Sequence, residues 1–61
     1  MNIKVGDIFW NEENAIYYVL YVSDIEVRYT LIYKSNISRN FVQKDIFENT
    51  MVEKRYTFQS T

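Results

Sequence analysis

The residues of this chain that could do chemistry are carboxylates, lysines, tyrosines and hydroxyls, because the sequence holds no histidine and no cysteine. Histidine is the commonest general base of enzymes, and cysteine is their strongest nucleophile. Asp45 and Glu48 lie three residues apart and could share one face of a helix. The same spacing also fits a helix start followed by a solvated surface. The sequence has neither a glycine-rich phosphate loop nor a nucleophile elbow, so we expect no enzymatic activity.

A metal site in this chain would have to be built from oxygen ligands alone. Glu12 and Glu13 are adjacent in a turn-prone stretch, where their side chains would diverge into solvent. No loop shows the regular acidic spacing of a calcium site. We therefore expect neither a metal nor another cofactor.

The elements that would position any site are centred on Ala15–Tyr33, which we interpret as two long β-strands joined at Ser23-Asp24. The first eight residues of this stretch are all apolar or aromatic, and residues 25–31 then alternate between apolar and polar. A two-residue turn would place Val22 opposite Ile25, and directly opposed residues of an antiparallel pair share a face. A four-residue turn gives the same facing, whereas a three-residue turn reverses it. The predicted core face comprises Ile16, Tyr18, Leu20, Val22, Ile25, Val27, Tyr29 and Leu31.

The rest of the chain predicts short elements around this hairpin. They are a bend at Gly6-Asp7 leading into a strand at Ile8, a polar loop at 34–38, a strand at 39–43, a helical turn at 45–48 and extended pieces at 51–52 and 56–58. We interpret the whole as one all-β domain over residues 1–61, a small five-stranded SH3-like barrel with one short helical turn. The remaining predicted core residues are Ile8, Trp10, Phe41, Phe47 and Phe58.

Several short motifs carry a resemblance to SH3-like domains. Val5-Gly6-Asp7-Ile8-Phe9, followed by Tyr17-x-Val19-x-x-Val22, is similar to the first half of many small bacterial and phage domains of that type. Phe47-Glu48, Met51 and Arg55-Tyr56-x-Phe58 are similar to the closing pattern of the DUF1653 family, which is also SH3-like. The resemblance covers most of the chain and implies the barrel fold. It implies no activity, because that family has no established one.

The composition favours a small cytoplasmic protein of mildly acidic character. The net charge is −1, with one basic and five acidic residues in 1–27 and six basic and three acidic residues in 28–61. The N-terminus lacks the apolar core of a signal peptide, and an apolar run of eight residues is too short to cross a bilayer. We therefore expect a cytoplasmic location without a membrane partner.

Protein binding is the function that the residues favour, through the other face of the hairpin. If the apolar face is the core, Tyr17, Val19 and Tyr21 point outward beside Arg28, and these residue types are common at interfaces. We expect a module that binds and regulates or inhibits a larger protein, of a host or of its own complex, such as an accessory factor of a phage or mobile element. Two alternatives stay open: a bulge could turn part of this face inward, or the terminal strands could cover it. Self-association is a further alternative, since a second copy stabilises so small a domain.

Nucleic-acid binding is the competing hypothesis. Small barrels can present aromatic rings to bases and basic groups to phosphates. The residues that could do so here are Lys34, Arg39, Lys44, Lys54 and Arg55. Against this, the sequence pI is about 5.2, whereas a nucleic-acid-binding domain is usually basic, with a pI above about 9.

Overall fold

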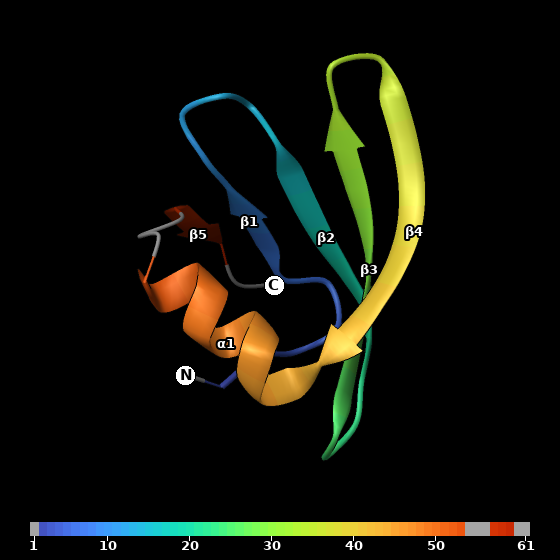
Figure 1. Cartoon of the computed structure of the whole chain (residues 1–61), viewed down its shortest axis with the longest axis vertical. Coiled ribbons are helices and arrows are strands. Elements are labelled where there is room, and N and C mark those ends of the chain that lie inside the picture. The colour runs from blue at the N-terminus through green and yellow to red at the C-terminus, as the bar shows by residue number, and fades with distance from the viewer. Residues whose placement is uncertain (1, 54–56, 60–61) are drawn as a thin grey trace.

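The computed structural model describes residues 2–53 and 57–59, with the side chains of residues 2–51, and shows a curved antiparallel sheet with one helix (Figure 1). The elements are β1 (Ile8–Trp10), β2 (Ile16–Val22), β3 (Glu26–Tyr33), β4 (Asn36–Gln43), α1 (Lys44–Glu53) and β5 (Thr57–Gln59). The strands lie in the order β4-β3-β2-β1-β5. The prediction of a mostly β fold is confirmed. The prediction of a closed barrel is wrong, because the sheet is open, with β4 and β5 at its two edges.

A tight bend before β1 is fastened to the middle of β2. Gly6 has a φ of 93°, a backbone conformation that glycine adopts without steric cost. Its N–H donates to the carbonyl oxygen of Val19 at 2.9 Å, and the N–H of Val19 donates to the carbonyl of Asp7 at 2.9 Å. The buried carboxylate of Asp7 closes the bend by accepting the backbone N–H of Lys4 at 2.8 Å. The chain therefore enters β1 in a fixed direction, as the Gly6-Asp7 motif predicts.

The turn between β2 and β3 is longer than the predicted two residues. Val22 lies opposite Val27 rather than opposite Ile25, so four residues form the turn. Ser23 holds this turn together: its N–H donates to the carbonyl of Glu26 at 2.9 Å, and its Oγ accepts the N–H of Glu26 at 3.1 Å. Ile25 lies in the turn with 76% of its surface exposed, and its prediction as a core residue is wrong.

The pairing of β2 with β3 shifts by one residue at Leu20. Tyr21 lies opposite Arg28, but Val19 lies opposite Tyr29, so Leu20 is the extra residue of a β-bulge. A shift of one residue moves every later side chain to the other face of the sheet. Val19 is consequently buried, while 41% of Leu20 is exposed. The predicted facing is therefore wrong for the first half of β2.

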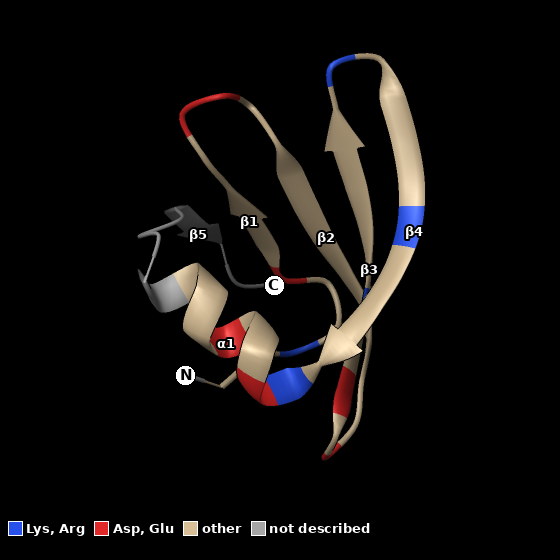
Figure 2. Cartoon of the chain, viewed as in Figure 1, with Lys and Arg blue, Asp and Glu red and all other residues tan. Residues whose placement is uncertain are grey.

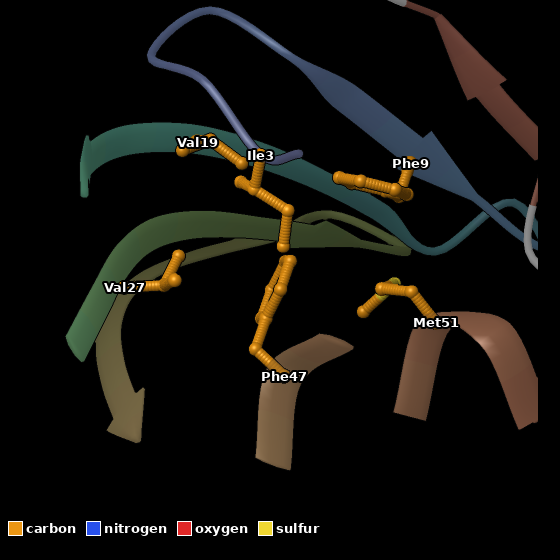
Figure 3. Packing of buried hydrophobic residues seen from close by; sticks show 6 residues of the cluster. All are labelled: Ile3, Phe9, Val19, Val27, Phe47 and Met51. Atoms are coloured by element: carbon orange, nitrogen blue, oxygen red, sulfur yellow. The ribbon is translucent and has the colours of Figure 1, made fainter. Parts of the chain in front are cut away.

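The hydrophobic core lies between α1 and the face of the sheet that we call the inner face (Figure 3). The buried apolar residues are Ile3, Phe9, Ala15, Val19, Val27, Phe47 and Met51. The ring of Phe47 meets that of Phe9 nearly edge-on, with 5.5 Å between centroids, and lies 5.4 Å from that of Tyr29. Met51 follows Phe47 by one helical turn and shares its buried face. The predicted helical turn at 45–48 is thus a ten-residue helix, and the predicted extended piece at 51–52 belongs to it.

The predicted core is confirmed in part. Val27 and Phe47 are buried, and Val22 and Tyr29 pack against the buried cluster. Tyr18, Leu20, Ile25 and Phe41 are exposed, whereas Ile8, Trp10, Ile16 and Leu31 are only partly buried, and the side chain of Phe58 lies outside the described residues. The predicted loop at 34–38 is also shorter than expected, because only residues 34 and 35 lie between β3 and β4.

The bulge predicts unequal losses of stability for two neighbouring substitutions. Val19→Ala removes two methyl groups from a fully buried site, so we expect the free energy of unfolding to fall by about 2–3 kcal/mol. Leu20→Ala removes a half-exposed side chain and should cost less than about 1 kcal/mol. Urea unfolding followed by circular dichroism measures both values. A larger loss for Leu20→Ala than for Val19→Ala would contradict the observed register.

Burial of Tyr29 predicts a loss of stability at alkaline pH. Desolvation raises the pKa of the Tyr29 hydroxyl above its usual value near 10. The folded chain then holds a proton that the unfolded chain loses, so the free energy of unfolding falls as the pH rises through about 10 and above. We expect Tyr29→Phe to weaken this decline in urea unfolding between pH 8 and 11. Tyr21→Phe, on the opposite face, is the matched control, and an equal weakening in both variants would refute the assignment.

Candidate protein interface on the outer face

The face of the sheet opposite α1 carries an exposed set of apolar and aromatic residues. The register of β2, β3 and β4 places Tyr21, Arg28 and Phe41 in one row across three strands. The next rows pass through Tyr18 and Arg39 and through the facing pair Ile32 and Ile37. We call the exposed members of this face the outer patch: Tyr18, Leu20, Tyr21, Arg28, Ile32, Ile37, Arg39 and Phe41.

Two residues of β4 are the most exposed apolar members of the outer patch. Phe41 exposes 76% of its surface and Ile37 exposes 72%, although both are large apolar side chains. Single exposed apolar residues are common on monomeric proteins, but contiguous apolar surfaces mark interaction sites. The outer patch joins apolar residues of three neighbouring strands. It therefore has the character of a surface that another molecule covers.

Arg28 is held flat on the outer patch by two neighbours. Its guanidinium carbon lies 4.8 Å from the centre of the Tyr21 ring, a cation–π contact. Its Nη2 donates to Oε1 of Glu26 at 3.2 Å. This hydrogen bond and the charge of Glu26 raise the pKa of Arg28 above its usual value, so the guanidinium stays charged. A stacked arginine beside tyrosine is a combination typical of binding hot spots.

A shallow groove of about 600 Å³ lies on the β3–β4 side of the outer patch. Leu20, Tyr21 and Phe41 provide apolar walls, and Arg28 and Arg39 bring two cations to its lining. Arg39 is exposed to solvent, and a guanidinium offers a fork of N–H donors suited to carboxylate or carbonyl oxygens. The groove can therefore hold an apolar side chain and bind an oxygen acceptor beside it.

The structure separates the four residues predicted to bind a partner. Tyr21 and Arg28 lie together on the outer patch, as predicted. Val19 is fully buried, and the ring of Tyr17 packs 5.4 Å from that of Tyr29 on the inner face. The prediction that Tyr17 and Val19 face outward is therefore wrong, because the bulge at Leu20 reverses the strand.

Leu20, Ile37 and Phe41 are not among the predicted site residues: Leu20 and Phe41 are predicted in the core, and Ile37 is predicted in a polar loop. A signal for β4 was present, since Ile37, Arg39 and Phe41 alternate along one strand and therefore share a face. The charge of Arg39 indicates that this face meets solvent. For Leu20 no such signal exists, because its neighbours in the sequence are all apolar.

Among the basic residues predicted to contact nucleic acid, the three that the structure describes lie far apart along β4 and its two ends (Figure 2). Lys34 lies in the turn between β3 and β4, and Lys44 is the first residue of α1, at the other end of β4. Arg39 lies between them on the outer patch. Lys54 and Arg55 lie outside the described residues. The part of the chain that the structure describes thus holds no continuous basic stripe.

A second hollow, of about 540 Å³, lies beside the start of α1 and contains carboxylates. Asp24, Asp45 and Glu48 contribute to its lining together with Lys44. Asp45 belongs to the first helical turn, where its Oδ1 accepts the N–H of Ile46 at 2.9 Å. A carboxylate at this position stabilises the helix, because it interacts favourably with the positive end of the helix dipole. Among the described side chains, those of residues 2–51, no three acidic groups lie closely enough together to hold a metal ion.

Two further observations bear on what the chain could be. Within the described ranges, no helix is long and apolar enough to cross a membrane. Comparison of the chain with protein-family models, with curated proteins and with solved structures finds no match. The geometry of the outer patch is therefore the basis for inferring a function.

Proposed function

We propose that this chain is a small interaction module that binds a larger protein through its outer patch. The observation that carries the proposal is the exposed apolar surface of β2, β3 and β4, opposite a face already occupied by the core. Tyrosine and arginine dominate the energetics of many protein interfaces. Here Tyr21 and Arg28 form a stacked pair with Phe41 in the same row.

The aliphatic part of the outer patch favours a protein partner over a nucleic acid. Ile32 and Ile37 face each other on adjacent strands, and Leu20 lines the groove. Single-stranded nucleic acids bind mainly through base stacking on aromatic rings and through contacts of phosphates with basic residues, and aliphatic side chains contribute little to either. Nucleic-acid binding through Arg39 with Tyr18, Tyr21 and Phe41 is the second candidate. It differs from protein binding in how capture should respond to nuclease and how affinity should respond to salt.

The proposal assigns no catalytic role to the chain. Its action is occupation of a partner's surface, by which a module of this size can regulate or inhibit a larger protein. Kinship with SH3-like domains such as the DUF1653 family and a cytoplasmic location remain part of the proposal. The support for the kinship is the Val5–Phe9 motif, which forms the bend and the start of β1.

The test is a capture experiment with variants of the outer patch. Tyr21→Ala combined with Phe41→Ala removes two exposed rings. We expect this double variant to stay folded but no longer to capture the protein that the parent chain captures. Each ring at a hot spot is worth at least about 2 kcal/mol, which corresponds to a roughly thirtyfold loss of affinity. Ile46→Ala is the matched control, since Ile46 is exposed on α1, away from the outer patch.

Nuclease treatment separates the two candidate functions. Capture of the same protein with and without nuclease, lost in the double variant and kept in Ile46→Ala, supports the proposal. Capture that disappears with nuclease, together with an affinity for oligonucleotides that falls steeply with salt, would favour the nucleic-acid candidate instead. Equal capture by the double variant and the parent chain would overturn the role of the outer patch.

A further inference from the structure

Strand β4 forms an exposed edge of the sheet that is open to pairing. Within the described part of the chain it has a strand neighbour on one side only, and all eight of its residues pair with β3 without a bulge. The other side of an edge strand presents unpaired backbone N–H and C=O groups, which form a template for another strand. Proteins commonly block such an edge with proline, a bulge or several charges. The sequence has no proline, and the charge on β4 is that of Arg39 alone.

We propose that two copies of this chain pair through β4, antiparallel, about a two-fold axis that passes beside Asn40. Residues that lie directly opposite each other in an antiparallel pair share a face of the sheet. A two-fold axis between two residues of β4 would place side chains of different faces opposite each other. The axis must therefore pass beside a residue. The choice among the central residues of β4 then decides which side chains meet. The axis beside Asn40 places residues 37–43 of one copy opposite residues 43–37 of the other.

The charge of Arg39 selects this register. An axis beside Arg39 would place the two arginines directly opposite each other, which destabilises a strand pair. An axis beside Asn40 places Arg39 opposite Phe41 of the second copy, twice in the dimer, and a guanidinium beside an aromatic ring is attractive. The chain already contains such a pair in the same row as Phe41, where the guanidinium carbon of Arg28 lies 4.8 Å from the ring centre of Tyr21. An axis beside Phe41 would leave only residues 39–43 paired, so it would forfeit backbone hydrogen bonds.

The second copy suits this edge better than an acidic or basic strand would. β4 carries no carboxylate and one cation, so two copies meet without a cluster of like charges when Arg39 faces Phe41. The net charge of −1 per chain adds little repulsion between copies. Seven paired residues span roughly 24 Å of strand. An interface of this size lies at the low end for specific complexes, so we expect a dimer that dissociates on dilution.

The dimer would place two outer patches on the same side of one continuous sheet. The two-fold axis stands perpendicular to the sheet, so the face opposite α1 points the same way in both copies. Phe41 lies next to the junction on each copy, and its row continues into Arg39 of the second copy. A partner with two binding sites would then bind with the gain in affinity that linked sites provide. The pairing itself does not depend on the proposed function.

Engineered cysteines test the register directly, because the chain has no cysteine of its own. In the proposed dimer the two copies of residue 40 are directly opposed, about 4.5–5.5 Å apart between Cα atoms, which suits a disulfide. We expect Asn40→Cys to form a covalent dimer under mild oxidation at least about tenfold faster than Ile46→Cys, an exposed control on α1. Cross-linking of Asn40→Cys no faster than that control would overturn the proposal. Faster cross-linking of Arg39→Cys or Phe41→Cys than of Asn40→Cys would overturn the register.

Sedimentation equilibrium of the unmodified chain provides the second measurement. We expect the average mass to rise with concentration from 7.4 kDa toward twice that value. Phe41→Lys would place a lysine opposite Arg39 of the second copy, so we expect this variant to stay monomeric while its circular dichroism spectrum is unchanged. A parent chain that is monomeric at millimolar concentration would refute the dimer. A parent chain that forms the dimer but captures no protein would instead contradict only the proposed function.

Discussion

The structure depends on the two backbone hydrogen bonds that join Val19 of β2 to the N-terminal bend. On one side its N–H and C=O bond to Asp7 and Gly6 of the N-terminal bend, both at 2.9 Å. On the other side it lies opposite Tyr29 of β3, next to the bulge at Leu20. Backbone groups buried away from water must find partners, and this arrangement supplies them where the strand is interrupted. The side chain of Val19 can therefore sit fully buried at the centre of the sheet.

The bulge determines which residues build the core and which form the outer patch. Before it, Val19 faces α1, and after it Tyr21 faces away while Val22 packs against the core. Without the extra residue, the apolar run of β2 would place Leu20 inside and Val19 outside. Helix α1 completes the inner face, since Phe47 touches the rings of both Phe9 and Tyr29. One local irregularity thus divides the apolar residues of the hairpin between two faces.

The sequence predicts β3 well and β2 poorly, for one physical reason. Glu26, Arg28 and Thr30 mark the outer face of β3, so the inward facing of Val27 and Tyr29 follows from alternation. The run from Ala15 to Val22 contains no polar residue to mark either face, and a bulge leaves no trace in such a run.

The residues of the candidate site divide in the same way into those whose facing the sequence indicates and those whose facing the bulge reverses. Arg28 and Tyr21 are predictable because a charged residue fixes the facing of its row, and Tyr21 lies between the bulge and the turn. Tyr17 is not predictable, because it lies beyond the bulge. The length of α1 is not predictable for a different reason. Phe47 and Met51 have the four-residue spacing of one helix face, but Asn49 and Thr50 between them favour helices weakly and obscure that pattern.

The open sheet explains why so short a chain leaves an apolar surface uncovered. A closed barrel removes its edges and packs its interior from all strands, but here α1 covers the inner face and the sheet ends at β4 and β5. One ten-residue helix can cover one face only, so no described element packs over Ile37 and Phe41. A domain of this size gains little from its own core, which is why contact with a second molecule is worth more to it than to a larger one. The exposed residues that no described element covers are therefore the surface that we propose as the binding site.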